Sequence, residues 1–229
     1  MPMQFEADSR RRLLGGVKRP SRYIGGEWGT GPVKDGTDIL RVCYAFPDLY
    51  EVGMSYLGFQ ILYSLTKKLP YADAERVYAP WLDLEALLRS SKTPLWSLES
   101  KRPISEFDVV GFTLQYELSY TNILTILDLG GIPFRSEHRG DNDPIVLAGG
   151  PGALSPEPVA PFIDAFCIGD GEVLLPEVYE QLHSLKGRPR AEKLEALSKI
   201  DGVYVPQIPP SKPVRRRIAE DLDNSFYPT

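Results

Sequence analysis

The side chains that most often carry out catalysis or bind metals are scarce in this sequence and form no known motif. The two cysteines, Cys43 and Cys167, lie inside apolar runs and lack both CxxC spacing and a third nearby thiol. The two histidines, His138 and His183, fall in a polar loop and on the flank of an expected helix. The patterns HExxH, GxSxG and CxxxCxxC do not occur. We therefore predict no catalytic residue, no metal ligand, and two buried, reduced thiols.

Two short apolar runs stop abruptly at glycines, and these stops are the strongest sign of a binding site. The run 145–148 continues as GGP (149–151), and the run 164–168 continues as GDGE (169–172). Glycines at such positions leave bare backbone against which a flat or bulky ligand could lie. GDGE also opens an expected helix, whose free N–H groups can bind polar or anionic groups. The alternative stays open, because Gly-Gly-Pro and Asp-Gly are common turns and acidic residues there can serve a helix N-terminus.

Two further loops carry polar residues. The segments 47–58 (PDLYEVGMSYLG) and 115–120 (QYELSY) each follow an expected strand. Their polar residues could contact the polar rim of a ligand or could equally link the loops to each other: Glu51, Ser55, Gln115, Tyr116 and Glu117. Neither GxGxxG nor GxxxxGK[ST] follows any expected strand, which disfavours a phosphate-binding loop.

The elements that must position these loops are expected to alternate between strands and helices. Short runs rich in β-branched or aromatic residues predict buried strands at 39–46, 107–114, 145–148 and 164–168, with a weaker one at 75–78. Apolar periodicity predicts helices at 56–69, 81–89, 118–129 and 173–185, and Pro176 has to fall in the first turn of the last one. The proline-rich connection between 148 and 164 predicts a loop with about one helical turn.

This alternation predicts an α/β fold, with a doubly wound sheet of five parallel strands in flavodoxin-like order and helices on both faces. The ligand crevice of such a sheet lies beyond the carboxyl ends of the strands, where the strand order reverses. The four loops would meet there. Residues 1–36 lack periodicity and predict an extended N-terminal arm, residues 37–205 predict the α/β domain, and residues 206–229 predict a linker.

Composition excludes several classes of protein. The 229 residues carry a net charge of −5, so no overall basic field favours nucleic acid. No apolar run approaches the roughly 18 residues of a membrane span, and the N-terminal residues lack the apolar region of a secretory signal. We therefore expect a cytoplasmic protein without a membrane partner.

The glycine-bearing segment 145–172 resembles the second half of the cobalamin-binding domain that precedes the catalytic domain in B12-dependent radical SAM proteins. Other segments extend the resemblance over about residues 20–229, among them RYIGGEW, YAFPDLYEVGMSYLGFQILY, ERVYAPWLDLEALL, FDVVGFTLQYELSYTNIL and DLDNSFYPT. These segments are similar to one bacterial subfamily of such proteins, of the Fe-S oxidoreductase type.

The resemblance implies a cobalamin-binding-domain-like, Rossmann-like fold, in which the GG(P) loop and the GDGE turn line the lower face and edge of a corrin. The cofactor-binding residues that it implies are Gly53, Met54, Ser55, Leu57, Gly58, Gln115, Tyr116, Glu117, Gly149, Gly150, Pro151, Gly169, Asp170, Gly171 and Glu172. It implies cobalamin as the cofactor of this chain. It assigns the [4Fe–4S] cluster and S-adenosylmethionine to a C-terminal part.

Two departures from the family pattern qualify these expectations. The loop PDLYEVGMSYLG stands where B12 enzymes carry DxHxxG and has no histidine, so a corrinoid would bind without a histidine ligand. The chain also stops before the CxxxCxxC motif that holds the cluster. We therefore expect the N-terminal part of a longer radical SAM enzyme, with this part alone having no activity.

Two classes of function follow. In the first, the chain is a cofactor module that holds a corrinoid next to the radical SAM domain, its partner within the same protein. In the second, it is a non-catalytic scaffold that has lost B12 and docks that domain or a macromolecular substrate. RNA is a candidate for that substrate because of the basic arm RRRLLGGVKRPSR and the tail residues Arg215 to Arg217.

Overall fold

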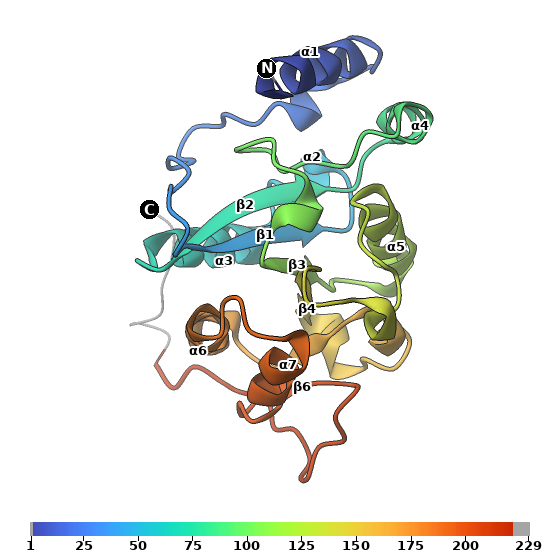
Figure 1. Cartoon of the computed structure of the whole chain (residues 1–229). Coiled ribbons are helices and arrows are strands. Elements are labelled where there is room, and N and C mark those ends of the chain that lie inside the picture. Colours follow the sequence, from blue (N-terminus) through green and yellow to red (C-terminus); the bar gives the residue numbers. More distant parts are fainter. Residues whose placement is uncertain (1, 222–229) are drawn as a thin grey trace.

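A central, mostly parallel sheet organises the computed structural model, which describes residues 2–221, with side chains from Ser9 onward (Figure 1). The strands are β1 (Leu40–Phe46), β2 (Ala72–Tyr78), β3 (Val109–Thr113), β4 (Ile145–Gly149), β5 (Ala165–Cys167) and β6 (Val203–Tyr204). Their order across the sheet is β2-β1-β3-β4-β5-β6. The first five are parallel and adopt the predicted flavodoxin-like order, so the expected α/β fold is confirmed.

The expected number of strands is wrong, because the sheet has six strands rather than five. The additional strand, β6, pairs antiparallel with β5 through Phe166 with Tyr204 and Cys167 with Val203. A two-residue strand gives no periodic signal in a sequence, and its run GVYVP ends at a proline after four residues. The short strand covers the outer edge of β5.

Helices cover both faces of the sheet. They are α1 (Pro2–Gly15), α2 (Tyr50–Gly53), α3 (Leu57–Lys68), α4 (Leu82–Ser91), α5 (Tyr120–Leu129), α6 (Gly171–Ser184) and α7 (Arg190–Ser198). Side chains alternate between two hydrophobic cores: Cys43 and Ala45 enter the core with α4 and α5, whereas Val42 and Tyr44 enter the core with α3, α6 and α7. Both faces of each strand are therefore buried, which explains the continuous apolar runs.

The N-terminal arm is not extended as expected, since Pro2–Gly15 form α1 and Pro20–Tyr23 form a 3-10 turn. A helix of this length is marginal on its own and takes its stability from tertiary contacts that a sequence pattern does not show. Leu13 and Leu14 pack against the core that contains α4, and the Lys18 backbone N–H donates to Asp83 at 2.9 Å. Figure 1 shows α1 beside α4, away from the sheet.

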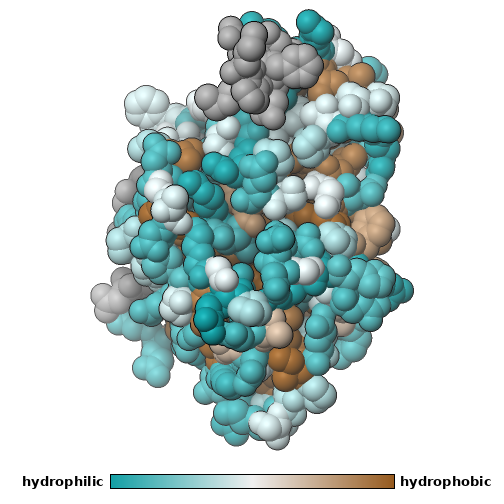
Figure 2. Space-filling model, in the orientation of Figure 1, coloured by the Kyte–Doolittle hydropathy of each residue, from teal (hydrophilic) through white to brown (hydrophobic). Residues whose placement is uncertain are grey.

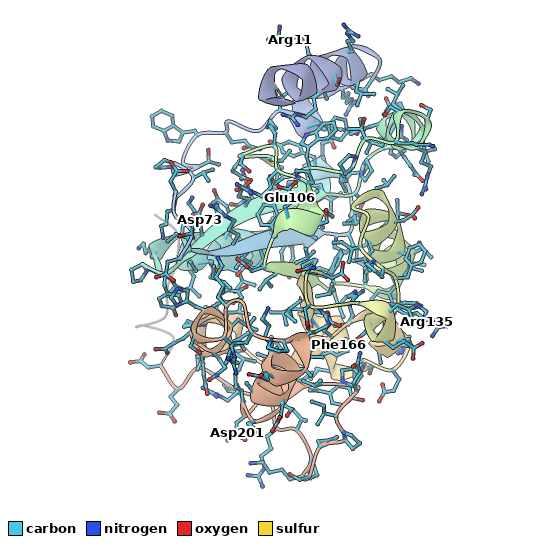
Figure 3. The ribbon with its side chains drawn as sticks, in the orientation of Figure 1. Arg11, Asp73, Glu106, Arg135, Phe166 and Asp201 are labelled. Atoms are coloured by element: carbon cyan, nitrogen blue, oxygen red, sulfur yellow. The ribbon has the colours of Figure 1, made fainter. Side chains whose placement is uncertain are left out.

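Strand β2 begins three residues before the expected strand. Its charged residues interrupt the apolar pattern by which a buried strand is predicted. Asp73, Glu75 and Arg76 are almost fully buried on this edge strand, where Figure 3 labels Asp73. Asp73 forms an ion pair with Lys67 at 2.6 Å, and Arg76 forms one with Glu99 at 2.7 Å. Pairing makes the burial of these charges tolerable, so the strand is longer than its apolar residues indicate.

Two other details depart from expectation. The connection between β4 and β5 contains two 3-10 turns, Pro151–Leu154 and Ala160–Phe162, instead of about one helical turn. Helix α6 begins at Gly171, so Pro176 is its sixth residue and lies in the second turn rather than in the first. Its missing N–H therefore removes one hydrogen bond near the start of the helix.

The face shown in Figure 2 is mostly hydrophilic, with hydrophobic side chains visible mainly between hydrophilic ones. No helix in the described part of the chain is long and apolar enough to cross a membrane.

Candidate functional site

A cavity of about 300 Å³ lies where β1, β3, β4 and β5 approach their carboxyl ends, on the side of the sheet covered by α3 and α6. Its position follows from the topology, because the connection from β1 leads to β2 on one side while β3 lies on the other. Open α/β sheets bind ligands at such reversals of strand order.

The inner part of the cavity is apolar, and side-chain alternation along the strands determines which residues form it. Leu147 and Cys167 share one face of the sheet with Tyr44 and contribute to the lining. Phe59 of α3 and Leu175 of α6 also line it. This lining suits a flat apolar group.

Two tyrosine hydroxyls in the lining form a hydrogen-bonded chain. The Tyr179 hydroxyl donates to the Tyr44 hydroxyl at 2.8 Å. The Tyr44 and Thr66 oxygens lie 2.8 Å apart, and Thr66 donates to the Leu62 carbonyl at 2.9 Å, so Tyr44 is the donor to Thr66. Burial raises the pKa of both tyrosines, which therefore stay neutral. Both hydroxyl protons are therefore used within this hydrogen-bonded chain of side chains.

The remaining lining of the cavity includes polar groups. Gln115 donates through Nε2 to the Thr113 hydroxyl, and among the described residues its carbonyl oxygen has no hydrogen-bond donor. Glu172 lies in the first turn of α6, whose leading N–H groups have no partner within the helix. Asp170 is already engaged, because its carboxylate accepts the Ala219 N–H at 2.9 Å and an Arg216 N–H at 3.2 Å.

The structure brings nine of the fifteen candidate residues together around this cavity. They are Gly58, Gln115, Gly149, Gly150, Pro151, Gly169, Asp170, Gly171 and Glu172. They come from the end of β4 and from the segments that follow β1, β3, β4 and β5, including the first residues of α3 and α6. The four loops that the sequence pointed to therefore meet at one place.

The other six candidates lie outside the cavity lining: Gly53, Met54, Ser55, Leu57, Tyr116 and Glu117. Gly53 is buried, and a Cβ there would lie 2.5 Å from the Tyr78 ring, so its glycine is a packing requirement. Met54 and Leu57 are exposed to solvent. Ser55 donates to the Val52 carbonyl, and Tyr116 donates to Asp48. These contacts link loop residues to one another.

Four glycines of the cavity lining, those of the GGP loop and the GDGE turn, differ in what requires them. Gly150 has a φ of +95°, and Gly169 has a φ of +142°, conformations that side-chain-bearing residues rarely adopt. A Cβ on Gly171 would lie 2.6 Å from a Leu62 methyl. A Cβ on Gly149 would meet only ordinary contacts, the nearest at 3.6 Å from the Cys167 carbonyl oxygen. Three of the four glycines therefore have a structural reason that needs no ligand.

Residues 58–206 match the model of a protein family described as "Radical SAM proteins, N-terminal". The match covers more than half of the chain. The chain belongs to this family.

Two solved structures of the cobalamin-dependent S-adenosylmethionine radical enzyme OxsB are similar to this radical SAM N-terminal domain. One has aqua-cobalamin bound, and the other has aqua-cobalamin and S-adenosylmethionine bound. Each shares 17% identity with this chain at a TM-score of 0.48, and each match covers 81% of this chain and 23% of the OxsB chain. The chain thus spans about a quarter of the length of OxsB. Among curated proteins, none matches this chain.

Sequence reasoning missed the aromatic and strand residues that line the cavity of this radical SAM N-terminal domain. Tyr44, Tyr56 and Tyr179 belong to them, as do Thr113 and Cys167. The period-2 alternation of β1 and β5 contains part of this signal, because Tyr44 and Cys167 lie on the same face as Leu147. The contribution of Tyr179 from the third turn of α6 depends on how that helix crosses the sheet, which the sequence does not specify.

Neither histidine of this radical SAM N-terminal domain lines the cavity. His138 is exposed, and His183 contacts the Asp38 carbonyl and the Tyr71 ring. Burial raises the pKa of the Cys167 thiol to about 12, so this thiol is neutral. Within residues 2–221, no group of three or more His, Cys, Asp or Glu side chains is placed to hold a metal ion.

Anaerobic reconstitution of the chain with iron and sulfide is expected to yield no stoichiometric [4Fe–4S] cluster. A cluster takes several thiolates, whereas Cys43 and Cys167 are buried in separate cores and burial raises the pKa of both. Iron and acid-labile sulfide analysis, together with the visible absorption spectrum, measures incorporation. One cluster per folded chain would contradict the expectation.

Proposed function

We propose that this chain is the corrinoid-binding module of a radical SAM enzyme and that it holds the corrinoid without a histidine ligand. The cavity carries the proposal, since it lies at the ligand-binding edge of the sheet and brings together nine residues that the family resemblance implied. A bound corrinoid would supply radical or group-transfer chemistry. The residues of this chain would bind and orient it.

The cavity fits part of such a ligand. At about 300 Å³ it is at the lower end of small-molecule pockets, so only a portion of a corrinoid could enter. The apolar lining around Phe59, Leu147 and Leu175 would contact a flat apolar portion. The Gln115 carbonyl and the first N–H groups of α6 would hydrogen-bond amide groups at its edge.

Histidine-free binding is consistent with the same geometry. His138 and His183 lie away from the cavity, and the neutral thiol of Cys167 is a poor metal ligand. Apolar contact and hydrogen bonds would therefore provide the affinity.

The same edge of the sheet also carries exposed hydrophobic side chains. Large hydrophobic side chains are exposed on the loops after β1, β2, β3 and β4: Val52, Met54, Tyr56, Leu57, Trp81, Leu82, Tyr116, Leu118 and Leu154. Exposed hydrophobic side chains that all follow strands at one edge of a sheet make this edge a candidate for an interaction site. In the proposal, the radical SAM domain of the full-length enzyme, which would carry the [4Fe–4S] cluster and S-adenosylmethionine, docks here.

A second candidate function is a scaffold that docks the radical SAM domain without binding B12. It is favoured by the glycines, because Gly150, Gly169 and Gly171 have structural reasons that need no corrin. Its nucleic-acid version has less support, since Arg216 pairs with Asp170 and Arg217 pairs with Glu177. These ion pairs reduce the positive charge that the tail would offer to RNA.

Filling the cavity is the test of where a corrinoid binds. Gly149→Leu is expected to weaken hydroxocobalamin binding at least tenfold, a loss of about 1.4 kcal/mol, because the new side chain starts in ordinary contact distance beside Cys167 and occupies the cavity. Equilibrium dialysis measures the dissociation constant.

Gly140→Leu is the matched control, because Gly140 is exposed and lies outside the cavity, and the nearest atom to a Cβ there would be an Asp143 carboxylate oxygen at 3.9 Å. Both variants should melt close to the wild type. Equal affinity of Gly149→Leu and the wild type would show that the cavity is not the site. No binding by a folded wild-type chain would favour the scaffold.

A further inference from the structure

The tail of the described chain is docked on the GDGE turn through a single β-bridge beside the end of β5. The Arg217 N–H donates to the Ile168 carbonyl at 3.0 Å, and the Asp170 N–H donates to the Arg217 carbonyl at 2.9 Å. Gly169 and Arg217 form a parallel β-bridge. We call residues 215–219 the strap. Its backbone continues the hydrogen bonding of the sheet beyond the end of β5.

Side chains hold the strap as well. The Asp170 carboxylate accepts the Ala219 N–H at 2.9 Å and an Arg216 N–H at 3.2 Å. Arg217 donates to Glu177 on α6 at 2.9 Å. Asp170 is the N-cap residue of α6 but makes no side-chain capping bond. Its carboxylate therefore serves the strap rather than the helix.

Two glycines make room for the strap. A Cβ on Gly169 would lie 2.2 Å from the Arg217 carbonyl oxygen, a backbone atom that cannot move aside cheaply. A Cβ on Gly202 would lie 2.5 Å from the Arg217 Cγ. Gly169, Asp170 and Gly171 also line the cavity. One turn is thus shared between the strap and the cavity.

We propose that the strap is a conformational latch whose docking and the occupancy of the cavity stabilise each other. The docked strap fixes the backbone of Gly169 and holds the Asp170 carboxylate with Arg216, which removes a free negative charge from the cavity lining. An undocked strap releases both. A ligand that binds better to the fixed turn must favour strap docking to the same degree, because such coupling is reciprocal. The coupling between strap docking and ligand binding rests on the proposed function, whereas strap docking itself does not.

Trypsin cleavage after Arg217 measures docking, because both backbone hydrogen bonds of Arg217 to the GDGE turn have to open before a protease can bind this peptide bond. In the full chain, Asp170→Ala is expected to raise the rate of cleavage there at least fivefold. Glu177→Ala should raise it less, because that ion pair is half-exposed. Glu195→Ala is the matched control, since it removes an exposed carboxylate paired with Lys199 outside the strap. Mass spectrometry of the released peptide identifies the bond that is cut.

Equal cleavage rates in Asp170→Ala, Glu195→Ala and the wild type would overturn strap docking. For the coupling, saturating hydroxocobalamin is expected to slow strap cleavage of the wild type at least threefold. Bound hydroxocobalamin that leaves the cleavage rate unchanged would overturn the latch. If equilibrium dialysis shows no binding, the proposed function and the coupling fail together, while the cleavage rates of the variants still decide strap docking.

Discussion

Replacing Arg76 with alanine is expected to lower the free energy of unfolding by about 3 to 5 kcal/mol, the usual cost of removing one partner from a buried ion pair. Arg76 is 3% exposed and pairs with Glu99 and Glu27, each at 2.7 Å. Its guanidinium also lies 4.8 Å from the centre of the Tyr63 ring. Without Arg76, the buried Glu99 carboxylate keeps its desolvation penalty and loses its partner.

Urea unfolding of Arg76→Ala and of the control Arg89→Ala measures this difference. Arg89 pairs with Asp128 at side-chain exposures of 47% and 39%, so its removal should cost less than about 1 kcal/mol. A loss below about 1 kcal/mol for Arg76→Ala would contradict the importance of the buried pair.

The loss in free energy of unfolding caused by Arg76→Ala should depend on pH. Burial already raises the pKa of Glu99 in the folded chain, and the loss of Arg76 raises this pKa further. A carboxyl whose pKa is higher in the folded than in the unfolded state destabilises the fold as the pH rises through that window. The loss in free energy of unfolding should therefore become smaller as the pH falls through the raised pKa of Glu99, because Glu99 then takes up a proton.

Gly169→Val is expected to lower the free energy of unfolding by about 3 kcal/mol or more. A φ of +142° is strained for valine, at about 1 to 3 kcal/mol. The new Cβ would in addition overlap the Arg217 carbonyl oxygen at 2.2 Å, so the strap has to move. Thermal and urea unfolding of the full chain measure the loss.

Gly149→Ala is the matched control for Gly169→Val. Gly149 lines the same cavity, but it has no positive φ, and its Cβ would meet only ordinary contacts. A compatible glycine-to-alanine change is neutral or stabilises by up to about 1 kcal/mol. If Gly169→Val were as stable as Gly149→Ala, the structural reason for Gly169 would be refuted.

The parts of the fold that the sequence predicted are those with a strong local signal. Continuous apolar runs such as those of β1 and β4 end at clear turn residues, and recognising them needs no tertiary information. Strand β2 was only partly predicted because a charged residue such as Asp73 can be buried in a strand only when it has an ion-pair partner, and the sequence pattern does not show that Lys67 supplies one. Helix α1 and strand β6 depend on contacts with α4 and β5 in the same way.

The candidate site shows the same limit at single residues. The glycines were predicted to lie together because topology brings the ends of β4 and β5 to one edge, and the structure places them there. The reason for each glycine was not predictable, because the clash at Gly169 comes from a strap 48 residues away in the chain. Leu57 and Tyr116 were expected in the site from the family resemblance, and their side chains lie exposed outside the cavity lining.

Titration of the folded chain with hydroxocobalamin, followed by its absorption spectrum, tests histidine-free corrinoid binding most directly. The wild type and the double variant His138→Ala, His183→Ala are compared, since both histidines lie outside the cavity. We predict saturable binding of one equivalent by both proteins. Their dissociation constants should agree within about twofold, a smaller difference than the tenfold change that corresponds to about 1.4 kcal/mol. No spectral change in a folded wild-type chain at high micromolar hydroxocobalamin, or loss of binding in the double variant, would contradict it.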